Sequence, residues 1–178
     1  SSHVTAYDSS HVTAYDSSQV TACGFSQVTA SRQVAVTKHG HLARVDGGVL
    51  TEYQPPQSIE EWLEDYGVEI RGDEAILFKG VQDDYRTSRD FLYEPGSAPE
   101  APDWDGGKQE CGGGLHFSPT PAHTLEFEQS AKRFLACPVK ISDIVIHPGG
   151  RCPQKVKAPR VSSPCWEVTI HGVPVEVK

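Results

Sequence analysis

The chain opens on the octad Ser1-Ser2-His3-Val4-Thr5-Ala6-Tyr7-Asp8, which residues 9–16 repeat without change. Two further copies, residues 17–24 and 25–32, drift in sequence but keep the central Val-Thr-Ala. A fifth copy keeps only Val36 and Thr37 in phase. A fixed short period is typical of solenoid and array proteins, so this repeat decides the fold expected for the N-terminal part.

Polar and apolar side chains alternate within each octad, as they do in a strand with one buried face. In the first copy Val4 and Ala6 share one face, His3 and Thr5 share the other, and turn-forming Asp and Ser residues follow. One octad cannot bury its small apolar face, but stacked octads can. We therefore predict a slim β-solenoid over residues 1–51, with about two octads per coil and an atypical closing coil over residues 33–51.

The outer face of this solenoid would carry ladders of Thr, Tyr and His or Gln. Thr and Tyr favour strands, so the ladders have a sufficient structural explanation. Two functional alternatives stay open: a flat Thr ladder could bind ordered water or ice, and paired histidines (His3 with His11, or His39 with His41) could hold a metal, although we assign no metal site. The repeat begins without a cap, so we expect a longer native array and self-association through unpaired strand edges.

Charge is distributed unevenly along the 178 residues, whose net charge is -8. Residues 52–110 hold sixteen acidic and five basic residues, whereas residues 111–178 hold five acidic and eight basic ones. The acidic middle argues against nucleic acid or an anionic membrane as a partner. No apolar run is long enough to span a bilayer, and no signal peptide is visible. The five cysteines contain no Cys-x-x-Cys pair, so we expect reduced thiols in a cytoplasmic or virion-associated protein.

The sequence Pro55-Pro56 predicts a linker over residues 52–57 and a second domain over residues 58–178. Ser58 and Glu61 form a capping box that predicts a short helix, and a second helix should begin after Thr120 and run toward Ala131. Residues 82–114 form a Pro- and Gly-rich loop that Trp104 should anchor. Strands are predicted over residues 68–70, 75–81, 115–117, 133–141, 144–147, 166–170 and 173–177. The fold class is mainly β: a solenoid followed by an α+β, mostly antiparallel domain with two short helices.

Three motifs occur in order in the second domain: Ile76-Leu77-Phe78-Lys79-Gly80, then Gly112-Gly113-Gly114-Leu115-His116-Phe117-Ser118-Pro119-Thr120-Pro121-Ala122, then Glu167. This order resembles the ADP-ribosyltransferase fold over roughly residues 74–170. That family has Arg or His on an early strand, Tyr or Ser-Thr-Ser before a helix, and a late Glu. Carried over, Lys79 takes the first position, His116 the Tyr position, Ser118 and Thr120 the Ser-x-Ser position, and Glu167 the Glu position.

The resemblance implies NAD as cofactor and cleavage of its nicotinamide bond through an oxocarbenium-like state. It implies that Glu167 polarises the nucleophile or a ribose hydroxyl, that Lys79 orients the ribose, and that His116 contacts the nicotinamide ring. Gly114, Ser118 and Thr120 would contact the cofactor, with phosphate at the helix start. The sequence departs from the family at Lys79 and His116, and Glu167 matches by order only. The acceptor, a protein or a small molecule, stays open.

Two function classes follow. In the first, an NAD-binding or ADP-ribosyltransferase-like effector domain is carried on a repeat stalk. In the second, the protein is non-enzymatic and the solenoid is a spacer or a self-association surface. The whole chain also resembles phage and actinobacterial proteins that place Ser-Ser-x-Val-Thr-Ala arrays before such a domain, and that resemblance brings no activity with it. Cys111, on a glycine loop near His116, is a further candidate nucleophile.

Overall fold

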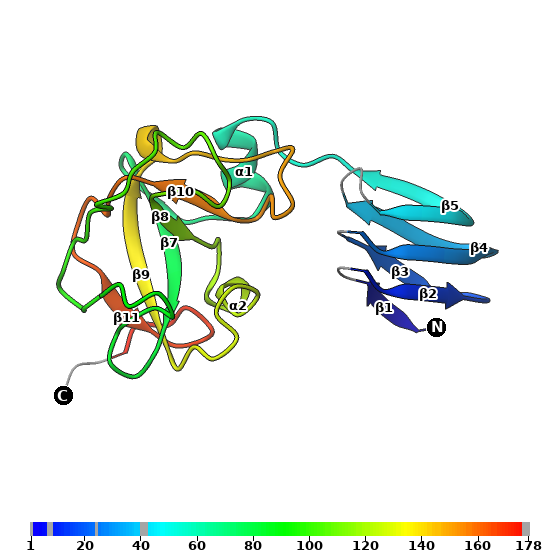
Figure 1. Cartoon of the computed structure of the whole chain (residues 1–178), viewed down its shortest axis with the longest axis horizontal. Helices are drawn as coiled ribbons and strands as arrows, with labels where there is room; N and C mark the ends of the chain where they lie inside the picture. The colour runs from blue at the N-terminus through cyan, green and yellow to red at the C-terminus, as the bar shows by residue number, and fades with distance from the viewer. Residues whose placement is uncertain (1, 7–8, 24, 40–42, 176–178) are drawn as a thin grey trace. The chain divides into compact units, whose positions relative to one another are not determined.

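The structure is a computed structural model that describes residues 2–6, 9–23, 25–39 and 43–175 (Figure 1). The chain divides into two compact units, Ser1–Pro55 and Pro56–Lys178. The division lies inside the linker predicted over residues 52–57. The protein is mainly β, and none of its described helices is long and apolar enough to cross a membrane.

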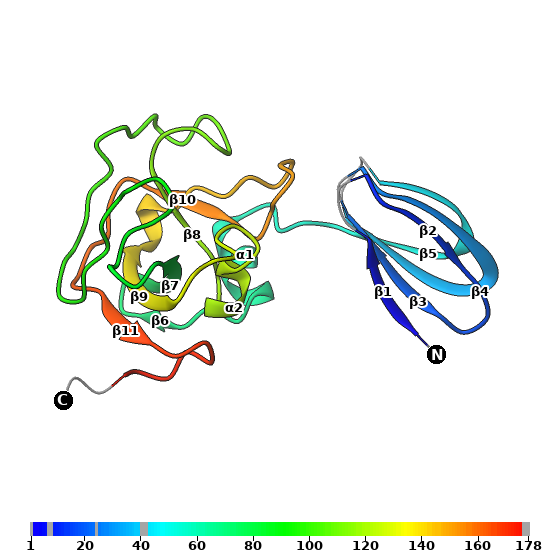
Figure 2. The ribbon, with the colours of Figure 1, turned by 60° about the horizontal axis from the view of Figure 1, so that its bottom comes forward.

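The N-terminal unit is one curled parallel sheet of five strands: β1 (His3–Ala6), β2 (His11–Ala14), β3 (Gln19–Ala22), β4 (Gln27–His39) and β5 (Arg44–Tyr53). In β1 and β3, Val4 lies opposite Val20, and in β3 and β4, Val20 lies opposite Val36. In β2 and β4, Val12 lies opposite Val28. Each pairing is therefore offset by two octads, and alternate octads belong to two different columns of strands (Figures 1 and 2).

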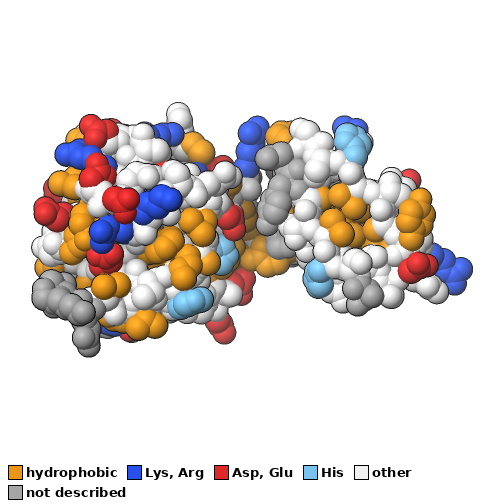
Figure 3. Space-filling view, turned by 90° about the horizontal axis from the view of Figure 1, so that it is seen from below, with side chains coloured by type: hydrophobic (Ala, Val, Ile, Leu, Met, Phe, Trp, Pro, Cys, Tyr) orange, Lys and Arg blue, Asp and Glu red, His pale blue; other side chains and the backbone are white. Residues whose placement is uncertain are grey.

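Small apolar residues fill the interior of this sheet. Val20, Val28 and Val36 are buried, and so are Ala6, Ala14, Ala22 and Ala30 at the second apolar position of each octad. Charged side chains are few on the face of this unit that Figure 3 shows. Burial of Val and Ala from every octad explains why stacked copies form a stable core that one copy could not form.

The last pairing departs from the two-octad offset. β5 pairs with β4 along both halves, but the register shifts between Ala30 and Ala35. Gly47 sits at this shift with φ of +80°, and a Cβ there would come within 2.2 Å of the Ala30 backbone oxygen. Only glycine fits such a position without moving the neighbouring strand. The loss of the octad after residue 32 thus coincides with a change in pairing geometry.

The register also decides one of the metal alternatives. His3 lies opposite Gln19, whereas His11 lies opposite Gln27 in the other column. The idea that His3 and His11 stack on one another is therefore wrong, because the described strands pair octads that are two copies apart. The side chain of His39 and residue His41 lie outside the described residues. The Thr ladder does form, and it runs through Thr5, Thr21, Thr37 and Thr51.

The C-terminal unit is α+β and mostly antiparallel, as predicted, with two short helices, α1 (Ile59–Asp65) and α2 (Pro121–Thr124). Its main antiparallel sheet has the order β11 (Trp166–Val168), β9 (Arg133–Lys140), β7 (Glu74–Val81) and β6 (Ile70–Arg71). A second sheet pairs β8 (Leu115–Phe117) with β10 (Val156–Ala158), and a 3-10 turn, η1, covers Ile141–Asp143. Trp62, Tyr93, Phe117 and Leu135 pack between the elements as the main core.

Several element predictions need correction. α2 ends at Thr124 instead of continuing toward Ala131, because the next backbone hydrogen bonds, from Leu125 N to Ala122 O and from Glu126 N to His123 O, span three residues as in a turn. Pro138 lies within β9, which is an inner strand, but β11 pairs only with residues 134–136, so the proline lies beyond the end of that pairing. Residues 144–147 form one isolated bridge at Val145 instead of a strand, and β11 stops at Val168. In the described part of the final segment, residues 173–175, a bridge forms at Pro174.

The long loop is anchored through a buried lysine. Lys157 of β10 is fully buried, and its Nζ lies 2.8 Å from Asp105 Oδ1 and 2.6 Å from Gln109 O. The same ammonium lies 5.7 Å from the centre of the Trp104 ring. The prediction that Trp104 marks an anchored loop is confirmed, and Lys157 is the partner that the sequence did not reveal.

Candidate functional site

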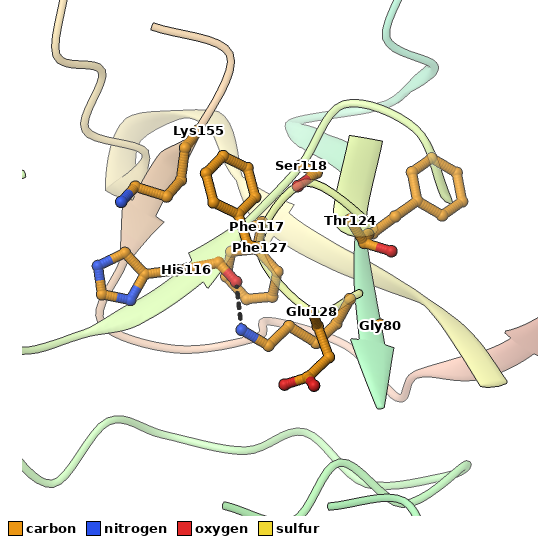
Figure 4. Close-up of a pocket in the computed structure, with 10 residues that line it drawn as sticks. Gly80, His116, Phe117, Ser118, Thr124, Phe127, Glu128 and Lys155 are labelled. Carbon is orange, nitrogen blue, oxygen red and sulfur yellow. Dashed lines mark hydrogen bonds between the residues drawn. The ribbon is translucent and has the colours of Figure 1, made fainter. Parts of the chain in front are cut away.

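Lys79 and His116 lie together because β7 and the end of β8 run side by side. Phe78 and Ser118 exchange backbone hydrogen bonds of 2.9 and 3.0 Å, which joins the two segments. Next to this bridge, Lys79 Nζ donates a 3.0 Å hydrogen bond to the backbone oxygen of His116, drawn as a dashed line in Figure 4. Burial lowers the pKa of Lys79 to about 8, so near neutral pH the group is mostly charged but close to titrating.

His116 is neutral in this environment. Its burial, together with the nearby Lys155 and Lys79 ammonium groups, lowers the pKa of His116 to about 4. Nε2 lies 3.2 Å from the backbone oxygen of Glu110. A carbonyl oxygen can only accept, so Nε2 carries the proton and Nδ1 holds the free lone pair. The ring can therefore accept a hydrogen bond without adding charge.

A cleft surrounds this pair. One cavity of about 240 Å³ is lined by Lys79, Arg89, His116 and Lys155, and an adjoining cavity of about 180 Å³ shares the first three of these residues. We call the site formed by these four residues the cationic cleft. Three basic side chains around one neutral imidazole favour an anionic ligand. A third, smaller cavity is also lined by Lys79, His116 and Lys155, and Figure 4 shows the His116 and Lys155 side chains on the same side of it.

Glu128 is a carboxylate that lines the larger of the two cavities, and Asp103 lines the adjoining one. The Glu128 oxygens accept hydrogen bonds from Ser88 N at 3.0 Å, Gln82 Nε2 at 3.1 Å and Ser130 Oγ at 2.9 Å. Burial raises the pKa of Glu128, but the hydrogen bonds from Ser88 and Ser130 outweigh burial and the net direction is downward. Glu128 therefore stays ionised beside Gly80 (Figure 4). The sequence did not single out Glu128, because its position fell within the helix predicted to run toward Ala131.

Arg89 and Lys155 were also missed by sequence reasoning. Arg89 belongs to the long loop, and Lys155 belongs to the turn before β10, so neither lies in one of the three motifs. The two residues reach the cleft only through the tertiary fold. A weak signal was present: residues 111–178 carry a basic excess inside an acidic protein.

The three predicted cofactor contacts have different surroundings. Ser118 is buried and lines a small inner cavity with Lys79 and His116. Gly114 lines the outer cavity with φ of +117°, and a Cβ there would lie 2.8 Å from the Trp104 ring. Thr120 caps α2, and its hydroxyl lies 2.8 Å from His123 Nδ1. Because α2 has only four residues, the helix dipole at its N-terminus would attract a phosphate only weakly.

Glu167 belongs to a separate cluster. It lies opposite Leu135, which in turn lies opposite Lys79, so β9 stands between the two polar residues. Glu167 Oε1 lies 2.9 Å from Arg133 Nη1, and Oε2 accepts a 2.8 Å hydrogen bond from the Tyr85 hydroxyl. Hydrogen bonding to Glu167 raises the pKa of Tyr85. The fold thus joins Lys79 to His116, and joins Glu167 to Arg133 and Tyr85.

Comparison with known proteins gives one match. Residues 75–175 match the model of a family described as a domain of unknown function, DUF7666. The match spans β7 through β11 and includes all four residues of the cationic cleft. No curated protein and no solved structure matches the chain.

Proposed function

Since the chain belongs to the DUF7666 family, whose description assigns no activity, we propose from the site itself that the C-terminal unit binds NAD in the cationic cleft. One observation carries the proposal: Lys79, Arg89 and Lys155 line one cavity around the neutral ring of His116. Arg and Lys are the residues that bind diphosphates by charge-assisted hydrogen bonds. The resemblance to ADP-ribosyltransferases supports NAD over other dinucleotides.

The residues present fit such a ligand. The diphosphate would contact Arg89 and Lys155, and Lys79 would bind the adjoining ribose or phosphate oxygen. Phe127 lines the same cavity with 41% of its surface exposed, which offers a ring face for base stacking. Nδ1 of His116 can accept a hydrogen bond from a ribose hydroxyl or an amide. The two adjoining cavities, of about 240 and 180 Å³, together reach the range usual for small-molecule sites.

Cleavage of the nicotinamide bond is the narrower part of the proposal. NAD and water would give nicotinamide, ADP-ribose and a proton, and a carboxylate stabilises the oxocarbenium-like state. The resemblance gives this role to Glu167, but Glu167 bonds Arg133 and Tyr85, is separated from Lys79 by β9 and does not line the cavity. Glu128 lines the cleft and is ionised. We therefore assign the carboxylate role to Glu128 and a positioning role to Glu167.

For the N-terminal unit we propose a β-solenoid stalk built from coils of two octads. The uniform two-octad offset of the β1–β3, β2–β4 and β3–β4 pairings supports this proposal. A second candidate function, self-association, is favoured by β1 and β2, each of which pairs with one strand only within the described part of the chain. Light scattering across a concentration series on chains with one and two added octad pairs tests it. Mass that rises with repeat number supports assembly, and a constant monomer contradicts it.

Binding is tested by calorimetric titration of the full chain with NAD, ADP-ribose and adenosine. We expect NAD and ADP-ribose to bind and adenosine, which lacks phosphate, to bind at least tenfold more weakly, since a charge-assisted hydrogen bond contributes about 1.5–3 kcal/mol. Arg89→Gln should weaken NAD binding by a similar factor. Lys132→Met, at an exposed lysine away from the cleft, is the matched control. Equal affinity for adenosine and NAD would overturn the proposal.

A further inference from the structure

Lys155 is a buried cation without a carboxylate partner. Only 8% of its surface is exposed, and it makes no ion pair with an Asp or Glu of the described residues. Lys157, two residues later, is also buried but lies 2.8 Å from the Asp105 carboxylate. Burial of an ammonium is costly unless an anion and hydrogen bonds compensate it. Among the described residues, the partners that compensate the burial of Lys155 are therefore not carboxylates.

The nearest polar partner of Lys155 is a thiol. Lys155 Nζ lies 3.2 Å from Cys111 Sγ and 5.3 Å from the centre of the Phe127 ring. An ammonium has donors only, so the sulfur must accept. The pair Cys111–Lys155 thus places a positive charge beside the sulfur. Reactive cysteines are found in such electropositive, accessible surroundings.

Cys111 is also the accessible cysteine. It is exposed at the edge of the cavity that Lys79, Arg89 and His116 line. Cys137 and Cys165 are buried against each other, with 3.4 Å between their sulfur atoms. Cys23 and Cys152 are half-buried, and burial raises the pKa of Cys152. Small reagents from solution would therefore meet Cys111 first.

We propose that Cys111, beside the buried ammonium of Lys155, is a site of thiol–disulfide exchange with small anionic disulfides. The Cys111 thiolate attacks one sulfur of the disulfide, a new S–S bond to Cys111 forms, and the old S–S bond breaks. The electron pair of the broken bond leaves with the other half as a thiolate, so the disulfide is the sole co-reactant. The nearby cations Lys79 and Arg89 favour a disulfide that carries negative charge.

This modification site does not depend on NAD binding, so the two proposals can fail separately. The test uses the full chain under pseudo-first-order conditions with three disulfides: dianionic dithiobis(nitrobenzoate), neutral hydroxyethyl disulfide and dicationic cystamine. Peptide mass mapping after substoichiometric labelling identifies the first cysteine to react. Each rate is divided by the rate of free cysteine with the same reagent. The normalised rate should be at least about tenfold higher for the dianionic reagent than for cystamine, and added salt should reduce that difference.

Variants separate the effect of the neighbouring charge from simple exposure. Cys111→Ser should remove the fast phase. Lys155→Met should slow the dianionic reagent by about tenfold near pH 7, because the positive charge beside the sulfur is lost. Lys155→Arg keeps the charge and should keep the fast phase, which covers the case in which the Met variant does not fold. Lys108→Met, an exposed lysine three positions from Cys111, should change the rate by less than about twofold.

Two results would overturn the proposal. One is first labelling at Cys23 or Cys152. The other is the absence of any preference among the three reagents after normalisation to free cysteine.

Discussion

Lys79 Nζ donates a 3.0 Å hydrogen bond to the backbone oxygen of His116, across the junction of β7 and β8. The bond fixes a lysine of low pKa next to a neutral imidazole, and the same ammonium lies 5.5 Å from the centre of the Tyr93 ring. An anionic ligand in the cleft would replace none of these contacts, because an ammonium has three protons to donate.

Affinity for NAD should fall as the pH rises through about 8. Burial lowers the pKa of Lys79 to about 8, so its ammonium is present below that pH and lost above it. A charge that attracts phosphate is lost on the alkaline side only. Calorimetry from about pH 6 to about pH 9.5 measures this trend, because that range spans the titration of a lysine whose pKa is lowered.

The control for this trend is Lys79→Met. The variant should bind NAD about tenfold more weakly than the unmodified chain near neutral pH, and its affinity should vary less with pH, because the titrating group is gone. If the NAD affinity of the variant changed with pH as it does in the unmodified chain, a group other than Lys79 would cause the trend.

Glu128→Gln and Glu167→Gln should have different effects. Glu128→Gln should abolish nicotinamide release while NAD still binds, because the amide keeps the shape but loses the charge. Glu167→Gln should lower the melting temperature and change nicotinamide release by less than about tenfold, because Glu167 bonds Arg133 and Tyr85. Release is measured by chromatography with excess NAD. Loss of turnover in Glu167→Gln alone, with a normal melting temperature, would return the catalytic role to that residue.

Asp105→Asn should destabilise the C-terminal unit more than Lys157→Met. The first change leaves Lys157 buried and charged without its partner, whereas the second removes the buried charge and keeps much of its volume. Hydrogen bonding to Lys157 lowers the pKa of Asp105. The Asp105 carboxylate therefore stabilises the fold above the pKa that this carboxyl has in the unfolded chain. That stabilisation is lost as the pH falls through the lower pKa of the folded chain. Thermal melts of both variants at neutral and acidic pH check the order and the trend.

Gly47→Ala should destabilise the N-terminal unit by more than about 1 kcal/mol, since it combines a left-handed φ with a clash. A Cβ at Gly47 would lie 2.2 Å from the Ala30 oxygen. Gly96→Ala is the matched control: φ there is +86°, and a Cβ would meet nothing within 4 Å. Denaturant melts followed separately for the two units measure both. Equal losses would show that φ alone sets the cost.

Local chemistry made much of the fold predictable. The octad period gave the parallel strands, Ser58 and Thr120 cap the two helices as expected, and strands 75–81 and 115–117 lie where alternation placed them. The length of α2 was not predictable, since nothing local marks the turn at Thr124. The pairing of Lys79 with His116 follows from a motif comparison, whereas Arg89, Glu128 and Lys155 join them only through tertiary contacts. Burial, which makes Lys155 and Lys157 unusual, is likewise not a property of sequence.

NAD binding in the cationic cleft is tested most directly by an NMR titration of the isotope-labelled full chain with NAD, followed at the backbone amides. The account predicts saturable shifts at Gly80, Ser88 and Arg89, which line the cleft, and at His116, with small shifts at Glu167 and none along β1 to β5. It predicts that Lys79→Met weakens all of these shifts together. No saturable shift at any of the four cleft amides, or shifts centred on Glu167 and Tyr85, would contradict it.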